Sequence, residues 1–212
     1  MNKIVEYAYT HFPYDVFTDR DIAQLTADGS SDSRYGLVKR SLKKGEIIRI
    51  RRGLYCLSKK YQRKPLNLYS IAQLIYGPSY ISLESALSYH GWIPEGVFVT
   101  TSVSMARSSS YKTAVGDFDY RRVIQEQFYD DVDCMAADDS SFFMAKPLKA
   151  LCDYVYVYKK AWASVDPLKK SLRIEEDVFA GIKGEEFDRL CSNYYSRRVK
   201  AFIKGVRKDL GV

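Results

Sequence analysis

The sequence predicts an α+β protein in which an N-terminal winged helix-turn-helix is followed by a mixed α/β domain. Three observations lead to this prediction. The first 64 residues show the patterns of three short helices and then a basic hairpin. Beyond Pro65, helix and strand patterns alternate. The charge balance also changes at the basic stretch of residues 59–65. We therefore expect two domains, residues 1–62 and residues 66–212.

Two short helices are predicted before residue 26. Residues 3–12 alternate apolar and polar positions, as in an amphipathic helix. Residues 17–25 form the second, with Thr18 as a natural N-cap. Acidic residues in its first turn suit the positive end of the helix dipole. A turn rich in glycine and serine follows at residues 28–31.

The third helix is predicted over residues 33–44, with a glycine directly after it as its stop. At about 100° per residue, Tyr35, Val38 and Leu42 share an apolar face that we expect to be buried. Leu37 lies off this face. The opposite face gathers small and basic residues, namely Ser33, Gly36, Lys39, Arg40, Lys43 and Lys44.

Two strands are predicted after this helix, residues 47–51 and 54–57, joined by a turn at Arg52 and Gly53. Three helices and a basic hairpin are the layout of a winged helix-turn-helix, whose third helix enters the major groove with its N-terminal residues at the base edges. The hairpin arginines would hold phosphates or reach the minor groove. The candidate DNA-binding residues are Ser31, Ser33 and Arg34 as base readers, Lys39, Arg40, Lys43 and Lys44 on the helix, and Arg49, Arg51 and Arg52 in the hairpin.

The charge of the chain is distributed unevenly. Between Arg34 and Lys64, twelve lysines and arginines stand against the single acid Glu46. Residues 65–212 hold 19 charges of each sign, so the formal net charge of +7 arises in the first third. Such a concentration indicates a polyanion partner, and double-stranded DNA fits the layout. The alternative is a winged helix used only for protein contacts, with a solvated basic face.

Other classes of chemistry lack their sequence signals. The chain has no phosphate-binding glycine motif and no nucleophile elbow. The four cysteines, Cys56, Cys134, Cys152 and Cys191, are far apart, so we expect reduced and mostly buried thiols in a cytoplasmic protein. No apolar run suits a signal peptide or a transmembrane helix. We expect no catalytic residue, no metal and no cofactor.

The second domain opens with a helix over residues 68–75. A further helix is expected between Ser82, a candidate N-cap, and Gly91, then a strand over residues 97–101, and a helix from Pro147. Three short motifs lie in or before these elements. The first is Arg52-Gly53-Leu54-Tyr55 in the hairpin. The second consists of Ser82, Ser85-Ala86-Leu87 and His90-Gly91, before a strand ending in Thr100-Thr101. The third is Pro147-Leu148-Lys149-Ala150-Leu151-Cys152-Asp153, after a hydrophobic strand.

These motifs, in this order, resemble the AbiEi-type antitoxins of bacterial abortive-infection type IV toxin–antitoxin systems. The resemblance implies an antitoxin-type second domain and a repressor of its own operon. It also implies that the winged helix binds inverted repeats in the chain's own promoter, an arrangement that suits a homodimer. The second domain would counter a nucleotidyltransferase-type toxin, and the two proteins need not touch.

Two features of the second domain invite an enzymatic alternative. His90 shares an apolar helix face with Leu83 and Leu87, so we expect a hydrogen-bonded core or interface histidine rather than a base. Acids gather over residues 117–139 and could hold a divalent metal in a divergent nuclease recruited by the winged helix. The chain has no Asp/Glu-x-Lys triplet, so we favour solvated acidic strands and loops.

The last predicted element is one packed helix over residues 185–210. Apolar residues recur there at helical spacing, acids lead and bases trail, as the helix dipole favours. Its basic end could add a second DNA contact or dock the acidic region of residues 117–139.

Overall fold

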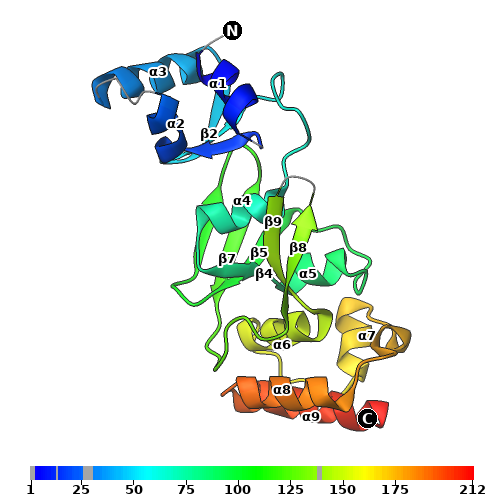
Figure 1. The fold of residues 1–212 in the computed structure, drawn as a ribbon. Helices are drawn as coiled ribbons and strands as arrows, with labels where there is room; N and C mark the ends of the chain where they lie inside the picture. The colour runs from blue at the N-terminus through cyan, green and yellow to red at the C-terminus, as the bar shows by residue number, and fades with distance from the viewer. Residues whose placement is uncertain (1–2, 13, 26–30, 138–139) are drawn as a thin grey trace.

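The computed structural model describes residues 3–12, 14–25, 31–137 and 140–212. The chain is a mixed α+β protein with a three-stranded and a six-stranded sheet, which confirms the predicted α+β class. Figure 1 shows an elongated molecule, with the first three helices at one end and the last two at the other. The first six elements are α1 (Lys3–His11), β1 (Val16–Thr18), α2 (Asp19–Leu25), α3 (Ser31–Lys43), β2 (Ile47–Arg51) and β3 (Leu54–Leu57).

The start of α2 follows from a reciprocal cap. The backbone N–H of Thr18 donates to the Asp21 carboxylate (2.6 Å), and the Asp21 N–H donates to the Thr18 hydroxyl (3.4 Å). The predicted cap at Thr18 is therefore confirmed. The sequence did not predict β1, which covers residues assigned to the start of the second helix. This strand pairs with β3, placing Phe17 opposite Tyr55.

Helix α3 begins and ends near its predicted limits, but its buried face is different. Leu37, Val38 and Ser41 are buried, whereas Tyr35 is 68% exposed. The predictions that Tyr35 points inward and that Leu37 lies off the apolar face are therefore wrong. Leu37 and Val38 join the small core formed by α1, α2 and the first sheet. The predicted turn before this helix falls on residues 28–31, and its first three residues lie outside the described part of the chain.

The six-stranded sheet has the order β6-β7-β5-β4-β9-β8 and carries the larger core. Helix α6 packs between α5 and α9. The elements are α4 (Leu68–Ile75), β4 (Ser79–Ile81), α5 (Leu83–Tyr89), β5 (Val99–Ser104), β6 (Ser109–Lys112), β7 (Asp117–Arg122), β8 (Val132–Ala137), β9 (Ser140–Ala145), α6 (Pro147–Val157), α7 (Asp166–Leu172), a 3-10 turn (Glu176–Phe179), α8 (Gly184–Asn193) and α9 (Arg197–Leu210).

Most predicted elements of this part are present. The helix predicted over residues 68–75 is α4, and Gly91 follows α5 with a φ of 72°, as expected of a helix stop. The strand predicted from residue 97 begins two residues later as β5. Phe98, just before it, is 96% exposed.

The predicted single C-terminal helix is wrong, because two helices, α8 and α9, occupy this segment. The chain becomes extended at Tyr194, and the Ser196 hydroxyl then accepts from the N–H of Val199 to begin α9. Gly205 lets α9 approach the preceding chain, since a Cβ at this position would lie 1.9 Å from the carbonyl oxygen of Ala163.

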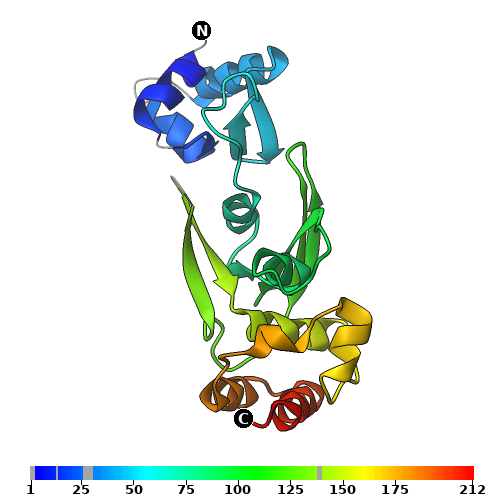
Figure 2. The same cartoon turned by 90° about the vertical axis from the view of Figure 1, so that its right-hand side faces the viewer.

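The two sheets are joined by packing rather than by a free tether. Ile50 and Leu54 on one face of the first sheet belong to the same hydrophobic cluster as Ile71 of α4. Figures 1 and 2 both place this sheet against the end of the second. Arg63, in the connecting segment, donates from its backbone N–H (2.7 Å) and its Nε (2.8 Å) to the carboxylate of Asp15. The division into domains at residues 62 and 66 stays a prediction.

The four cysteines are free thiols. Cys56 and Cys152 are buried and Cys191 is partly buried, but Cys134 on β8 is exposed, so the expected burial holds only in part. Burial, with the nearby Asp15 carboxylate, raises the pKa of Cys56 to about 12, which keeps this thiol protonated and unreactive. Among the described residues, no helix combines the length and apolar character needed to cross a bilayer.

Candidate nucleic-acid interface

The basic side of α3 faces away from the core. Because Leu37, Val38 and Ser41 are buried, helical geometry turns the opposite residues to solvent. We call Asp32, Gly36, Lys39, Arg40 and Lys43 the outward face of α3. Its three cations are exposed, and no carboxylate of the described residues pairs with them. They are therefore available to an external anion.

The N-terminal end of α3 differs from the expectation in one respect. Ser33 is exposed, as a base reader must be, but Arg34 is only partly exposed, because it continues the stripe of Leu37, Val38 and Ser41. Tyr35 takes the exposed position instead. Ser31 begins the helix, and its side chain lies outside the described atoms. An apolar stripe through Leu37 and Val38 was also visible in the sequence. Choosing it would have placed Tyr35 on the exposed side of the helix.

The three hairpin arginines have unequal surroundings. The Arg49 guanidinium lies over the Tyr55 ring (5.9 Å to the centroid), and that of Arg51 lies over the Tyr111 ring (6.0 Å) in the second sheet. Arg52 is exposed in the turn, and within the described chain no ring or carboxylate lies against it. Of the three, Arg52 is the most available to a ligand.

The hairpin is held against the start of α2. The carbonyl of Gly53, whose φ is 77°, accepts from the N–H of Asp19 (3.1 Å). Burial raises the pKa of Tyr55 on β3 of the hairpin, the Asp19 carboxylate raises it further, and Arg49 opposes this. These contacts fix the position of the hairpin relative to α2. Lys44, just beyond α3, is exposed near the hairpin base.

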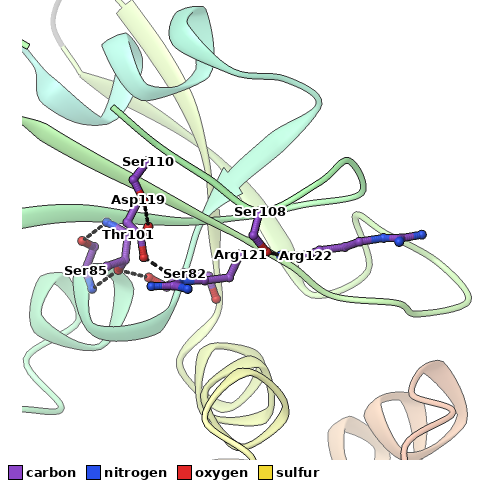
Figure 3. Close-up of polar contacts among 8 residues, drawn as sticks. All are labelled: Ser82, Ser85, Thr101, Ser108, Ser110, Asp119, Arg121 and Arg122. Atoms are coloured by element: carbon purple, nitrogen blue, oxygen red, sulfur yellow. Dashed lines mark hydrogen bonds and ion pairs between the residues drawn. The ribbon is translucent and has the colours of Figure 1, made fainter. Parts of the chain in front are cut away.

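The residues considered for nuclease chemistry are engaged in local contacts. The Asp119 carboxylate accepts from the Ser110 hydroxyl (2.6 Å) and from Nε of Arg121 (2.7 Å), as Figure 3 shows. On the neighbouring strand β5, the Thr101 hydroxyl donates to the carbonyl of Ser82 and accepts from the backbone N–H of Ser85 on α5. The Thr101 backbone N–H in turn donates to the Ser85 hydroxyl. No group of three or more His, Cys, Asp or Glu side chains in the described ranges is placed to hold a metal ion.

His90 has the structural role expected of it. It ends α5, and its Nε2 lies 3.0 Å from the carbonyl oxygen of Ala145 at the end of β9. The predicted hydrogen-bonded histidine is therefore confirmed.

A buried polar network in the second sheet was missed by the sequence reasoning. The fully buried Asp153 carboxylate accepts hydroxyl hydrogen bonds from Tyr80 (2.9 Å), Ser82 (2.7 Å) and Tyr194 (2.6 Å). The buried Lys149 ammonium lies over the rings of both tyrosines, 5.3 and 5.2 Å from their centroids. Burial, followed by the Asp153 charge, raises the pKa of both tyrosines, so both stay protonated donors. The network ties the segment between α8 and α9 to β4 and α6.

The basic C-terminal helix does not extend the α3 surface, because α9 lies at the opposite end of the molecule (Figure 1). Its Arg207 pairs with Asp188 of α8 at 2.5 Å. The acidic region is met by α8 instead, where Arg189 pairs with Asp131 at 2.9 Å. The predicted docking by the basic end of the last helix is thus replaced, among the described residues, by this contact from α8.

Residues 14–58 match a family model described as "Transcriptional regulator, AbiEi antitoxin". The matched segment contains β1, α2, α3 and the β2–β3 hairpin. The resemblance predicted from the sequence is confirmed by this match. Comparison with curated proteins found no match.

Proposed function

We propose that the chain is a sequence-specific double-stranded DNA-binding transcriptional repressor whose first six elements form a winged helix-turn-helix. The observation that carries the proposal is the coincidence of two findings in one segment. Residues 14–58 match a transcriptional-regulator family, and the same segment exposes Lys39, Arg40 and Lys43 on one face of α3. The element order and the sheet order β1-β3-β2 support the winged-helix assignment.

The proposed contacts follow from this arrangement. The N-terminal part of α3, with Ser31, Ser33 and Arg34, enters the major groove. Lys39, Arg40 and Lys43, with Lys44 beyond them, neutralise phosphates that flank the groove. Arg52 reaches the backbone or the minor groove from the hairpin turn. Arg49 and Arg51 contribute after leaving the tyrosine rings they cover.

The family description supports a further part of the proposal. The chain acts in the cytoplasm as the antitoxin of a type IV toxin–antitoxin system and represses its own operon through inverted repeats. Two copies bind the two half-sites, since a repeated site mirrors a two-fold arrangement of protein. Its functional counterpart is a nucleotidyltransferase-type toxin, which it opposes without obligatory contact.

We propose no enzymatic activity for the chain. The nuclease alternative needs carboxylates free to bind a metal, and Asp119 is already bound by Ser110 and Arg121. The protein-docking alternative gives no reason for three exposed, unpaired cations on the outward face of α3 within the described structure. DNA binding accounts for them directly.

The hairpin provides a test that depends on this geometry. We expect Arg52→Ala to weaken binding to all duplexes similarly and to lower the salt dependence of affinity by about one phosphate contact. Arg51→Ala should have a smaller effect, because its guanidinium is already engaged by Tyr111. Titrating fluorescent duplex from upstream of the gene at several salt concentrations measures both. A larger effect of Arg51→Ala would contradict the proposed role of the hairpin.

A further inference from the structure

Gly36 occupies the middle of the outward face of α3. The buried side chains of Leu37, Val38 and Ser41 define the inward direction of this helix. At about 100° per residue, position 36 points nearly the opposite way, between Asp32 on the preceding turn and Arg40 on the following one. The helix therefore carries no side chain in the middle of this face, although Gly36 is only partly exposed because the Arg40 guanidinium lies beside it.

Nothing within the described structure requires glycine at this position. Gly36 has no positive φ, and a Cβ there would meet only Nη1 of Arg40 at 3.2 Å, the far end of a flexible side chain. Gly205 provides the contrast, because a Cβ there would collide with the backbone of Ala163. Glycine is a poor helix former, so Gly36 weakens α3 without an internal compensation.

The surroundings of Gly36 indicate what approaches it. Lys39, Arg40 and Lys43 lie on the same exposed surface without carboxylate partners among the described residues. A polyanion held by these cations is brought close to the backbone one turn before Arg40, at Gly36, with Asp32 on the turn before that. A glycine allows such a ligand to come closer than any side chain would permit. In a major groove, the group at that position is the edge of a base pair.

We infer that a base-pair edge in the major groove packs directly against the α3 backbone at Gly36, so that this glycine sets the depth of the helix in the groove. The inference rests on the proposed DNA binding and adds a specificity-determining residue to it. In the free protein the Arg40 guanidinium lies beside this surface, and it moves to a phosphate when DNA binds. A methyl group at position 36 holds the helix away from the bases while leaving the phosphate contacts largely in reach.

The test is Gly36→Ala, with Gly96→Ala as the matched control. Gly96 is exposed, has no positive φ and has open space around a Cβ. We expect Gly36→Ala to raise Tm by about 2 °C through helix propensity. It should also weaken binding to the upstream duplex roughly tenfold, with little change for a shuffled duplex. Gly96→Ala should leave the affinities for both duplexes unchanged.

Two explanations for Gly36 are possible, namely close approach of a base edge and room for the Arg40 side chain. The variant Arg40→Ala separates them. If base edges approach the backbone, Gly36→Ala weakens specific binding by a similar factor in the wild-type and Arg40→Ala backgrounds. If the glycine only makes room for Arg40, the effect vanishes in the Arg40→Ala background, and the inference is overturned. Equal affinity of Gly36→Ala and wild type for the upstream duplex overturns it too. If the wild-type protein binds upstream and shuffled DNA equally, the proposed sequence-specific binding is itself contradicted, and the inference about Gly36 falls with it.

Discussion

Replacing Lys39, Arg40 and Lys43 together with glutamine should reduce DNA affinity on the order of a hundredfold or more. These side chains are the exposed cations of the outward face of α3, and each is expected to release a counterion from the duplex. The slope of log affinity against log salt should fall by about three. Fluorescence anisotropy at several salt concentrations measures both quantities, and circular dichroism checks that the fold is kept.

The C-terminal helix offers a charge-matched control for that variant. Replacing Lys200, Lys204 and Lys208 with glutamine removes the same formal charge from α9, at the opposite end of the molecule (Figure 1). Specific binding should then change little. An equal loss of affinity in the two triple variants would show that net charge, rather than the α3 surface, governs binding.

The largest expected effect on stability comes from Asp153→Ala. This change leaves three hydroxyl donors without their acceptor. It also removes the carboxylate from a buried network whose Lys149 ammonium then keeps only Gln125 Oε1 and the rings of Tyr80 and Tyr194. Leaving buried donors and a buried charge uncompensated costs about 3–5 kcal/mol. Urea denaturation followed by circular dichroism measures the free energy of unfolding.

Two further variants test the cause of that loss. Tyr194→Phe removes one donor and should cost about 1–3 kcal/mol. Lys149→Met combined with Asp153→Leu removes both charges, and it should be more stable than Asp153→Ala alone. A loss below about 1 kcal/mol for Asp153→Ala would contradict the proposed importance of this network.

Local signals made much of the N-terminal segment predictable. The cap at Thr18, the glycine after α3 and the two-residue turn at Arg52 each act over a few residues, so sequence spacing is enough to find them. The inward face of α3 was harder, because Tyr35 and Leu37 each fit an apolar stripe containing Val38. Only the position of the core decides between them, and it buries Leu37.

Contacts between distant parts of the chain could not be predicted in the same way. Strand β1 exists through pairing with β3, about forty residues later in the sequence. The stacking of Arg51 on Tyr111 depends on how the two sheets pack, and the Asp153 network joins residues from 80 to 194. The break between α8 and α9 also depends on a distant contact. The chain becomes extended at Tyr194, whose hydroxyl donates to the Asp153 carboxylate.

The shared core of the two sheets has a consequence for DNA recognition. Ile50 and Leu54 belong to the same hydrophobic cluster as Ile71, so the first sheet, on which α3 packs, is held against the second. A duplex bound at α3 would therefore hold the remainder of the chain in one direction from the groove. This places α9 away from the duplex segment that α3 reads, unless the DNA bends toward it (Figure 2).

The most direct measurement is fluorescence anisotropy with wild-type protein and DNA from immediately upstream of its own gene, against a shuffled duplex of equal length, at two salt concentrations. We expect tighter binding to the upstream duplex, with a preference that persists at the higher salt, because base contacts do not depend on counterion release. Equal affinity for both duplexes, lost together at the higher salt, would contradict sequence-specific binding and reduce the α3 surface to a nonspecific electrostatic patch.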